Sequence, residues 1–361
     1  MAVSSSKIQV MVVDDSAVIR GLFTQVLESD NSIKVVASVG DGEQAIKALQ
    51  RTEVDVVLLD IEMPNMDGLT ALPQLIKAKP GLTVIMASSL TERNAEISLR
   101  ALRMGATDYV TKPSSREALR QADDFKRDLV TKVLALSGKS VKSESGAAPL
   151  NGAAFATAQK SKEIVLREPG KIKPSILAIG SSTGGPQALV ECLKPITDSI
   201  KLPIVITQHM PPTFTAILAN HLHQASGWPA AEAKDGDVIQ GGHIYVAPGG
   251  KHMLIQSGGL KKTISLSDSP PENFCKPAVD PMLRSLVEAF GPAVLVLILT
   301  GMGADGCAGS KHVVEAGGTV IAQDEATSVV WGMPGAVASS GLCSAVLPLN
   351  EIGAKISKLA A

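Results

Sequence analysis

The sequence has few cysteines, almost no net charge and no long apolar segment. Its four cysteines are widely spaced and form no CxxC pair, which argues against a zinc site or a disulfide framework. The formal net charge is -1, so the basic surface that nucleic-acid binding requires is not indicated. The longest apolar runs, such as residues 293–300, are far shorter than a bilayer span, and residues 1–10 lack the apolar core of a signal peptide. We therefore expect a cytoplasmic protein that is not membrane-embedded and binds no nucleic acid.

The chain is long enough for two domains. Of its 361 residues, 45% are hydrophobic, which allows each domain to bury its own core. In residues 7–125, short β-branched runs alternate with amphipathic segments. This alternation is typical of an α/β fold with a doubly wound parallel sheet, and we assign residues 1–125 to the first domain.

Residues 126–170 separate this domain from the next. They begin with the end of a helical pattern, and residues 137–162 then contain much Ser, Ala, Gly and Lys but few large apolar side chains, as in a flexible linker. Strand and helix patterns resume in residues 171–361, where the glycine-rich residues 243–266 have the alternation of antiparallel strands. We predict a second α/β domain here, with a doubly wound, mostly parallel sheet and an antiparallel hairpin.

Charged side chains follow three predicted strands of the first domain. Asp14 and Asp15 follow one strand, Asp60 ends another, and Lys112 follows a third. The carboxyl ends of parallel strands meet at one edge of a sheet, where ligands bind. A single aspartate at such a place is more often a helix cap. Several acids together repel one another unless a hard cation binds them, so we predict a Mg2+ site.

The motifs MVVDDSAVIR, LLDIEMPNMDGL and YVTKP resemble the receiver domain of two-component response regulators over about residues 7–125. The resemblance implies a flavodoxin-like fold in which Asp60 accepts a phosphoryl group from a histidine kinase. The implied Mg2+ ligands are Asp14, Asp15, Asp60 and the backbone carbonyl of Glu62. The implied switch residues are Ser88, Tyr109 and Lys112. Phosphorylation adds about -1.5 to -2 charge, enough to draw a nearby hydroxyl and lysine inward.

The segment GSSTGGPQAL, residues 180–189, joins an apolar run to a helical pattern. It lacks the spacing of a GxGxxG or Walker phosphate loop, and alone it is best interpreted as a structural turn. However, His209 and Asp305 also follow apolar strands. Ser182, His209 and Asp305 are therefore expected to meet at one edge of a parallel sheet. A hydroxyl, an imidazole and a carboxylate in contact form a nucleophilic triad.

Each member of this set also has a plainer interpretation. Taken alone, His209 is an ordinary loop histidine, and Asp305 is the cap of a helix that begins near Gly306. The order serine, histidine, aspartate and the absence of GxSxG exclude the α/β-hydrolase fold. The helix predicted just after Ser182 offers backbone amides that suit an oxyanion.

The motifs IGSSTGGPQAL, VITQHM, VDPMLRSL and LTGMGADG resemble the catalytic domain of chemotaxis protein-glutamate methylesterases over about residues 171–361. The resemblance implies that Ser182 is the nucleophile, with His209 and Asp305 as its partners. It also places Thr183 and Met302 in the oxyanion region. Lys276 stands where relatives often carry arginine, so the bidentate fork of a guanidinium is missing there.

Together the two resemblances imply a phosphorylation-activated hydrolase of chemotaxis adaptation. It would remove methyl esters from glutamate side chains of methyl-accepting chemoreceptors, releasing methanol, and would deamidate receptor glutamines through the same acyl-enzyme route. A chemotaxis histidine kinase would be the phosphodonor, and Mg2+ would serve the receiver alone, with no cofactor for hydrolysis. Until it is phosphorylated, the receiver would obstruct the catalytic edge.

Three other functions fit part of the pattern. They are a phosphorylation-gated hydrolase of another substrate, a phosphorylation-dependent binding module with an inert serine turn, and a DNA-binding response regulator. The near-neutral charge and the lack of a helix-turn-helix pattern argue against the last. Methanol release from methylated receptors tests the first, and covalent labelling of the serine tests the second.

Overall fold

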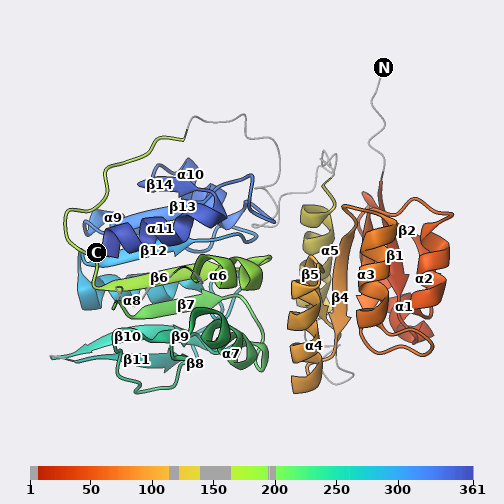
Figure 1. The fold of residues 1–361 in the computed structure, drawn as a ribbon, viewed down its shortest axis with the longest axis horizontal. Helices are drawn as coiled ribbons and strands as arrows, with labels where there is room; N and C mark the ends of the chain where they lie inside the picture. Colours follow the sequence, from red (N-terminus) through yellow and green to blue (C-terminus); the bar gives the residue numbers. More distant parts are fainter. Residues whose placement is uncertain are drawn as a thin grey trace. The chain divides into compact units, whose positions relative to one another are not determined.

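The computed structural model describes residues 7–113, 122–138, 164–193, 195, 201–259 and 261–360. The chain divides between residues 157 and 158 into two compact bodies, each with its own parallel sheet (Figure 1). Most of the segment expected to be a linker, residues 137–162, lies outside the described residues. Within the described ranges, no helix combines the length and the apolar character needed to cross a bilayer.

The first body contains a parallel sheet with the strand order β2-β1-β3-β4-β5. The strands are β1 (Ile8–Val13), β2 (Ile33–Val39), β3 (Val56–Asp60), β4 (Thr83–Ser88) and β5 (Asp108–Thr111). Every residue of β3 is buried, as expected for a strand covered by helices on both faces. The helices are α1 (Ala17–Leu27), α2 (Gly42–Leu49), α3 (Gly68–Ala78), α4 (Glu92–Arg103) and α5 (Ala122–Leu136). Helix α1 packs with α5, and α3 packs with α2 and α4, which confirms the doubly wound receiver fold.

Helices α1, α2, α3 and α4 are capped by side chains other than Asp14, Asp15 and Asp60. The residues that cap α1, α2, α3 and α4 by accepting a backbone N–H bond are Ser16, Asp41, Asp67 and Thr91. The helix after β1 is thus capped by Ser16 rather than by Asp14 or Asp15. A capping role does not account for these two acids.

The second body contains a parallel sheet with the strand order β14-β13-β12-β6-β7-β9-β8. The strands are β6 (Ile176–Ser181), β7 (Ile204–Gln208), β8 (Ala230–Glu232), β9 (Ile244–Val246), β12 (Val294–Ile298), β13 (Thr319–Gln323) and β14 (Ala345–Leu347). The helices are α6 (Gly185–Leu193), α7 (Phe214–Ser226), α8 (Val279–Phe290), α9 (Cys307–Glu315), α10 (Met333–Ser339) and α11 (Leu349–Ala360). Helix α6 packs with α7 and α11, whereas α9 packs with α8 and α10.

The predicted antiparallel hairpin is present but starts later than expected. Strands β10 (His252–Gly258) and β11 (Lys261–Ser267) pair antiparallel and pack on α8. The expectation that the whole segment 243–266 is antiparallel is wrong for β9, which pairs in parallel with β7 and β8. All three residues of β9 are buried, which suits a strand inside a helix-covered parallel sheet.

The order of the second sheet places three loops side by side. Strand β6 lies between β12 and β7, and all three run in the same direction. The chain proceeds from β6 toward β7 on one side and later returns to β12 on the other, so the switch point of the sheet lies at β6 and β12. Ligands bind at such a point, outside the carboxyl ends of the strands. The residues that follow β6, β7 and β12 there include Ser182, His209 and Asp305.

Candidate active site and phosphoacceptor site

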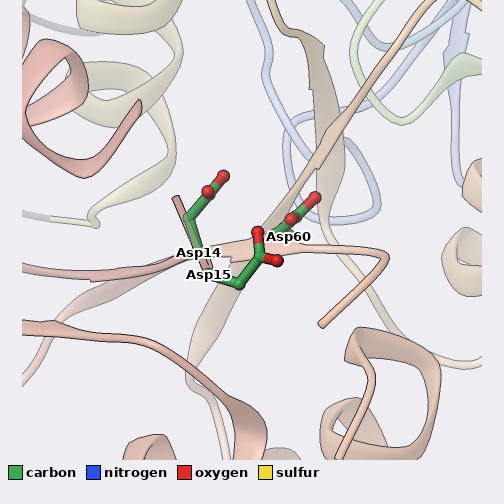
Figure 2. Close-up of side chains that lie close together, drawn as sticks. All are labelled: Asp14, Asp15 and Asp60. Carbon is green, nitrogen blue, oxygen red and sulfur yellow. The ribbon is translucent and has the colours of Figure 1, made fainter. Parts of the chain in front are cut away.

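The carboxyl edge of the first sheet gathers three acids. Asp14 and Asp15 follow β1, and Asp60 is the last residue of the neighbouring strand β3 (Figure 2). One carboxylate oxygen from each lies within 4.8 Å of the others, with Asp14 and Asp60 buried and Asp15 exposed. Several oxygen ligands without nitrogen or sulfur suit a hard divalent cation. The residues present therefore fit the acidic Mg2+ site that is typical of a receiver domain.

Lys112 bridges the two buried acids of this cluster. Its Nζ lies 2.7 Å from Asp14 Oδ2 and 2.6 Å from Asp60 Oδ1. Burial raises the pKa of Asp60 to about 6, and the charge of Asp14 raises it too, although Lys112 acts in the opposite direction. One ammonium group thus does not offset the carboxylates, and a cation would lower their free energy further.

The other two predicted switch residues, Ser88 and Tyr109, lie on the neighbouring strands β4 and β5. Ser88 ends β4 and is buried, and its backbone carbonyl accepts a 2.7 Å hydrogen bond from the Lys112 amide. Tyr109 is buried in β5, and its backbone carbonyl accepts a 2.6 Å bond from Lys132 Nζ.

The loop after β3 passes very close to Asp60. A Cβ atom at Gly68 would lie 2.0 Å from the backbone oxygen of Asp60, so only glycine fits there. This contact explains the glycine of the MDGL motif. Glu62, in the same loop, has an exposed side chain, with Oε1 3.8 Å from Arg93 Nη1.

The three loops of the second sheet are joined by backbone hydrogen bonds. The amide of Ser182 donates to Thr300 O at 3.0 Å, and the amide of His209 donates to Ser181 O at 3.0 Å. These bonds continue the pairing of β6 with β12 and β7 beyond the last residues of the strands. The backbone at Ser182 is therefore fixed between the loops that carry His209 and Asp305.

The imidazole of His209 is bonded to Asp305. His209 Nε2 lies 2.7 Å from Asp305 Oδ2, and both side chains are largely buried. Asp305 also accepts backbone N–H bonds from Val279, Asp280 and Gly306 at 2.6, 3.1 and 3.0 Å. Burial alone would raise the pKa of Asp305, but His209 and these amides bring it down to about 2. Asp305 is thus a charged acid in contact with His209, and its bond at the start of α9 is to Gly306, the residue directly before that helix.

The other ring nitrogen of His209 faces a thiol rather than the predicted nucleophile. Cys275 Sγ lies 3.3 Å from His209 Nδ1. Among the described residues, the Ser182 hydroxyl forms no hydrogen bond with His209. The structure therefore brings His209 and Asp305 into contact and places Ser182 on the adjoining loop, one hydrogen bond short of a complete triad. Catalytic bonds of this kind often close only when substrate is bound.

The two neighbouring serines have different surroundings. Ser181 is fully buried, and its hydroxyl donates a 2.7 Å bond to Gln208 Oε1. Gln208 Nε2 in turn donates to the carbonyl oxygens of Ser182 and His209 at 2.9 and 3.1 Å. Ser182 is only partly buried. Ser181 is therefore a structural group, and Ser182 is the serine that can meet a substrate.

The turn between Ser182 and α6 is as tight as its glycines suggest. A Cβ atom at Gly185 would lie 2.0 Å from Gln208 Oε1, so a side chain there would displace the amide that holds both loops.

Thr183 is buried, and its carbonyl accepts a 2.9 Å bond from Thr300 Oγ1. Met302 is partly buried in the loop after β12. The Nζ of Lys276 donates to Asp268 O at 2.9 Å.

The sequence did not predict three residues whose side chains contact Ser182, His209 or Asp305. They are Gln208, Asn273 and Cys275. Gln208 stands directly before His209 in the motif VITQHM, so its position at a strand end could have indicated a role. Asn273 and Cys275 lie in a short turn before α8, where no motif or periodicity singles them out.

The fold and the two sites define a response regulator with an α/β enzyme domain. Residues 10–123 match the model of the "Response regulator receiver domain", and residues 177–356 match that of "CheB methylesterase". A protein-glutamate methylesterase/protein-glutamine glutaminase 1 of Paramagnetospirillum magneticum is 54% identical over 371 residues, which cover 99% of this chain and 97% of the relative. The corresponding protein of Azospirillum brasilense is also 54% identical, with 99% and 94% covered.

A solved structure agrees with this match. The crystal structure of the Thermotoga maritima CheB methylesterase catalytic domain is 40% identical, with a TM-score of 0.51, and covers 52% of this chain and 100% of its own. The chain belongs to the CheB methylesterase family.

Proposed function

We propose that this chain is a protein-glutamate methylesterase and protein-glutamine glutaminase of chemotaxis adaptation, acting on methyl-accepting chemoreceptors. The observation that carries the proposal is the His209–Asp305 pair, 2.7 Å apart, next to Ser182 at the switch point of the sheet. Family membership supports the substrate class. The test is release of labelled methanol from methylated receptor membranes by the intact chain, with and without a phosphodonor.

The geometry supports an acyl-enzyme route. Ser182 Oγ attacks the carbonyl carbon of the glutamyl ester, and its proton passes to His209 Nδ1, because Nε2 is held by Asp305. Methanol leaves with that proton, and water then hydrolyses the acyl-enzyme. A glutamine side chain has the same carbonyl and would release ammonia. Backbone amides at the start of α6, in the region of Thr183 and Met302, would stabilise the oxyanion.

For this route, Ser182 must take the place of Cys275 at His209 Nδ1. Burial lowers the pKa of His209, but Cys275 and Asp305 outweigh it and hold the pKa well above its usual value. A general base must be neutral, so this rise moves the acid limb of the activity profile to higher pH.

We expect Cys275→Ala to move the acid limb to lower pH. Without the thiol, the pKa of His209 falls, and neutral imidazole persists in more acidic solution. The measurement is the initial rate of methanol release against pH for the wild type and Cys275→Ala, with Cys307→Ala as a control thiol. If the midpoint of the acid limb stays unchanged or moves to higher pH in Cys275→Ala, Cys275 does not raise the pKa of His209.

The receiver is proposed to control access to this site. A chemotaxis histidine kinase would phosphorylate Asp60, and Ser88, Tyr109 and Lys112 would transmit the change. Without the phosphoryl group, the receiver would obstruct the catalytic edge. We assign residues 1–125 to the receiver, 126–170 to the helix end and linker, and 171–361 to the catalytic domain. The four free cysteines agree with a cytoplasmic location.

The residues that would hold Mg2+ are Asp14, Asp15, Asp60 and the backbone carbonyl of Glu62. The ion would offset their charge and that of incoming phosphoryl oxygens. Hydrolysis at Ser182 is proposed to need no cofactor.

We expect Asp15→Asn to weaken Mg2+ binding on the order of tenfold, because one charged ligand is lost. The affinity of the wild type should also fall as the pH is lowered through about 6, where Asp60 takes up a proton. Isothermal titration of the intact chain with Mg2+ measures both effects. Asp67→Asn is the control, since Asp67 caps α3 outside the cluster and asparagine also caps helices. Equal affinities of Asp15→Asn and Asp67→Asn would rule out this ligand set.

A further inference from the structure

A strained turn lies directly against the His209–Asp305 pair. Glu272 and Cys275 exchange backbone hydrogen bonds of 3.1 and 2.9 Å, and the two residues between them, Asn273 and Phe274, have φ values of 53° and 63°. Two consecutive positive φ angles are the pattern of a type I′ turn, which normally uses glycine and asparagine. Phenylalanine in this region is costly, and such cost concentrates where local geometry serves function.

The turn is fastened to α8 by an ion pair. Arg284 donates two hydrogen bonds to Glu272, at 2.7 Å to Oε1 and 2.6 Å to Oε2. This bidentate geometry is the most directional form of an arginine–carboxylate pair. The position of Asn273 relative to the first turn of α8 is therefore well defined.

Asn273 uses its amide group to bridge two buried acids. Its Nδ2 lies 2.9 Å from Asp280 Oδ2 and 2.9 Å from Asp305 Oδ1, so each amide hydrogen has its own acceptor. Asp280 also accepts a 2.6 Å bond from the Gly309 amide. Both carboxylates are buried, with exposed fractions of 3% for Asp280 and 2% for Asp305.

We propose that Asn273 is a positioning residue for hydrolysis: by donating one hydrogen to each acid, it keeps Asp305 charged and turned toward His209. The inference rests on the proposed function of the site. Two buried carboxylates this close share a proton unless hydrogen bonds stabilise both charges. If that proton occupied Asp305, His209 would lose its orienting anion.

The charges around the pair agree with this role. His209 faces Asp305 from the loop after β7, Asp280 and Arg284 face it from α8, and Glu272 and Cys275 belong to the turn. Burial and the charge of Asp305 together raise the pKa of Asp280 to about 6, although the hydrogen bonds from Gly309 and Asn273 lower it. Without Asn273, proton uptake by the two acids would begin at higher pH.

The test uses Asn273→Gly in the full chain. Glycine keeps the positive φ and removes only the amide. We expect methanol release to fall on the order of tenfold at the acid end of the profile, through kcat rather than KM, and the loss to shrink as the pH rises and the two acids release their shared proton, because one pKa unit is a factor of ten. Phe274→Gly, at the other positive φ, is the control for a loosened turn. Its profile of methanol release against pH should keep the midpoint of the wild type.

A second variant separates positioning from folding. Adding Asp280→Asn to Asn273→Gly removes the competing acid and should restore the wild-type midpoint. An unchanged pH profile in Asn273→Gly, or a loss that is equal at every pH and not restored in the double variant, would overturn the proposal. Ser182→Ala in the same assay must be inactive; if it hydrolyses esters normally, the proposed function itself fails, whatever Asn273 does.

Discussion

Ser182→Ala is expected to abolish methanol release from methylated receptors while leaving the fold intact. Loss of the nucleophile removes the acyl-enzyme route, and the rate should drop on the order of 10⁶-fold, the size of effect seen when a triad serine is removed. Ser182 is partly buried, and alanine leaves its backbone bond to Thr300 unchanged. Initial rates with labelled receptor membranes and a thermal unfolding curve measure the two outcomes.

The neighbouring Ser181→Ala is the matched control. Within the described part of the chain its hydroxyl bonds only to Gln208, so we expect a loss of stability of about 1 kcal/mol and retention of most activity. A serine-directed covalent reagent should label the wild type and Ser181→Ala but not Ser182→Ala. If Ser182→Ala hydrolyses receptor esters at the normal rate, Ser182 is not the nucleophile. If no variant releases methanol but the reagent still labels Ser182, the substrate is a different ester or amide.

Asp60→Asn is expected to remove all acceleration by a phosphodonor and to leave the resting rate. Asparagine keeps the shape of the side chain but cannot accept the phosphoryl group. The charge change that would move Lys112 and Ser88 then never arises. The measurement is receptor demethylation by the intact chain in the presence of Mg2+, with and without phosphodonor.

Asp67→Asn is the control for this experiment, because it changes a nearby acid that caps α3 without joining the cluster. It should respond to the phosphodonor like the wild type. Equal rates with and without phosphodonor in the wild type would refute inhibition by the receiver. Acceleration that survives in Asp60→Asn would instead mean that another residue accepts the phosphoryl group.

Much of both sites was predictable because strand ends are easy to locate in a sequence. Asp14, Asp60 and Lys112 each stand directly after or at the end of a short apolar run, and a parallel sheet brings such positions to one edge. The same reasoning placed Ser182, His209 and Asp305 on neighbouring loops. Their catalytic roles stay predictions that the experiments above address.

The surroundings of His209 were not predictable in this way. Asn273 and Cys275 contact the His209–Asp305 pair from a turn with two positive φ angles. The residues Asn-Phe of this turn do not carry the Asn-Gly signal of such a turn. Its conformation is instead imposed by α8 through Arg284 and by the two acids. The parallel pairing of β9 was not predictable either, because a run of three apolar residues fits a parallel or an antiparallel strand equally well.

The anchoring of Asp305 by main-chain amides has a consequence for how this enzyme can vary. Val279 and Asp280 supply N–H groups that almost any amino acid would also supply. Substitution in the first turn of α8 can thus keep Asp305 hydrogen-bonded, whereas inserting or deleting one residue ahead of Val279 would shift both of these donors out of register. At this place, chain length is more constrained than chemical identity.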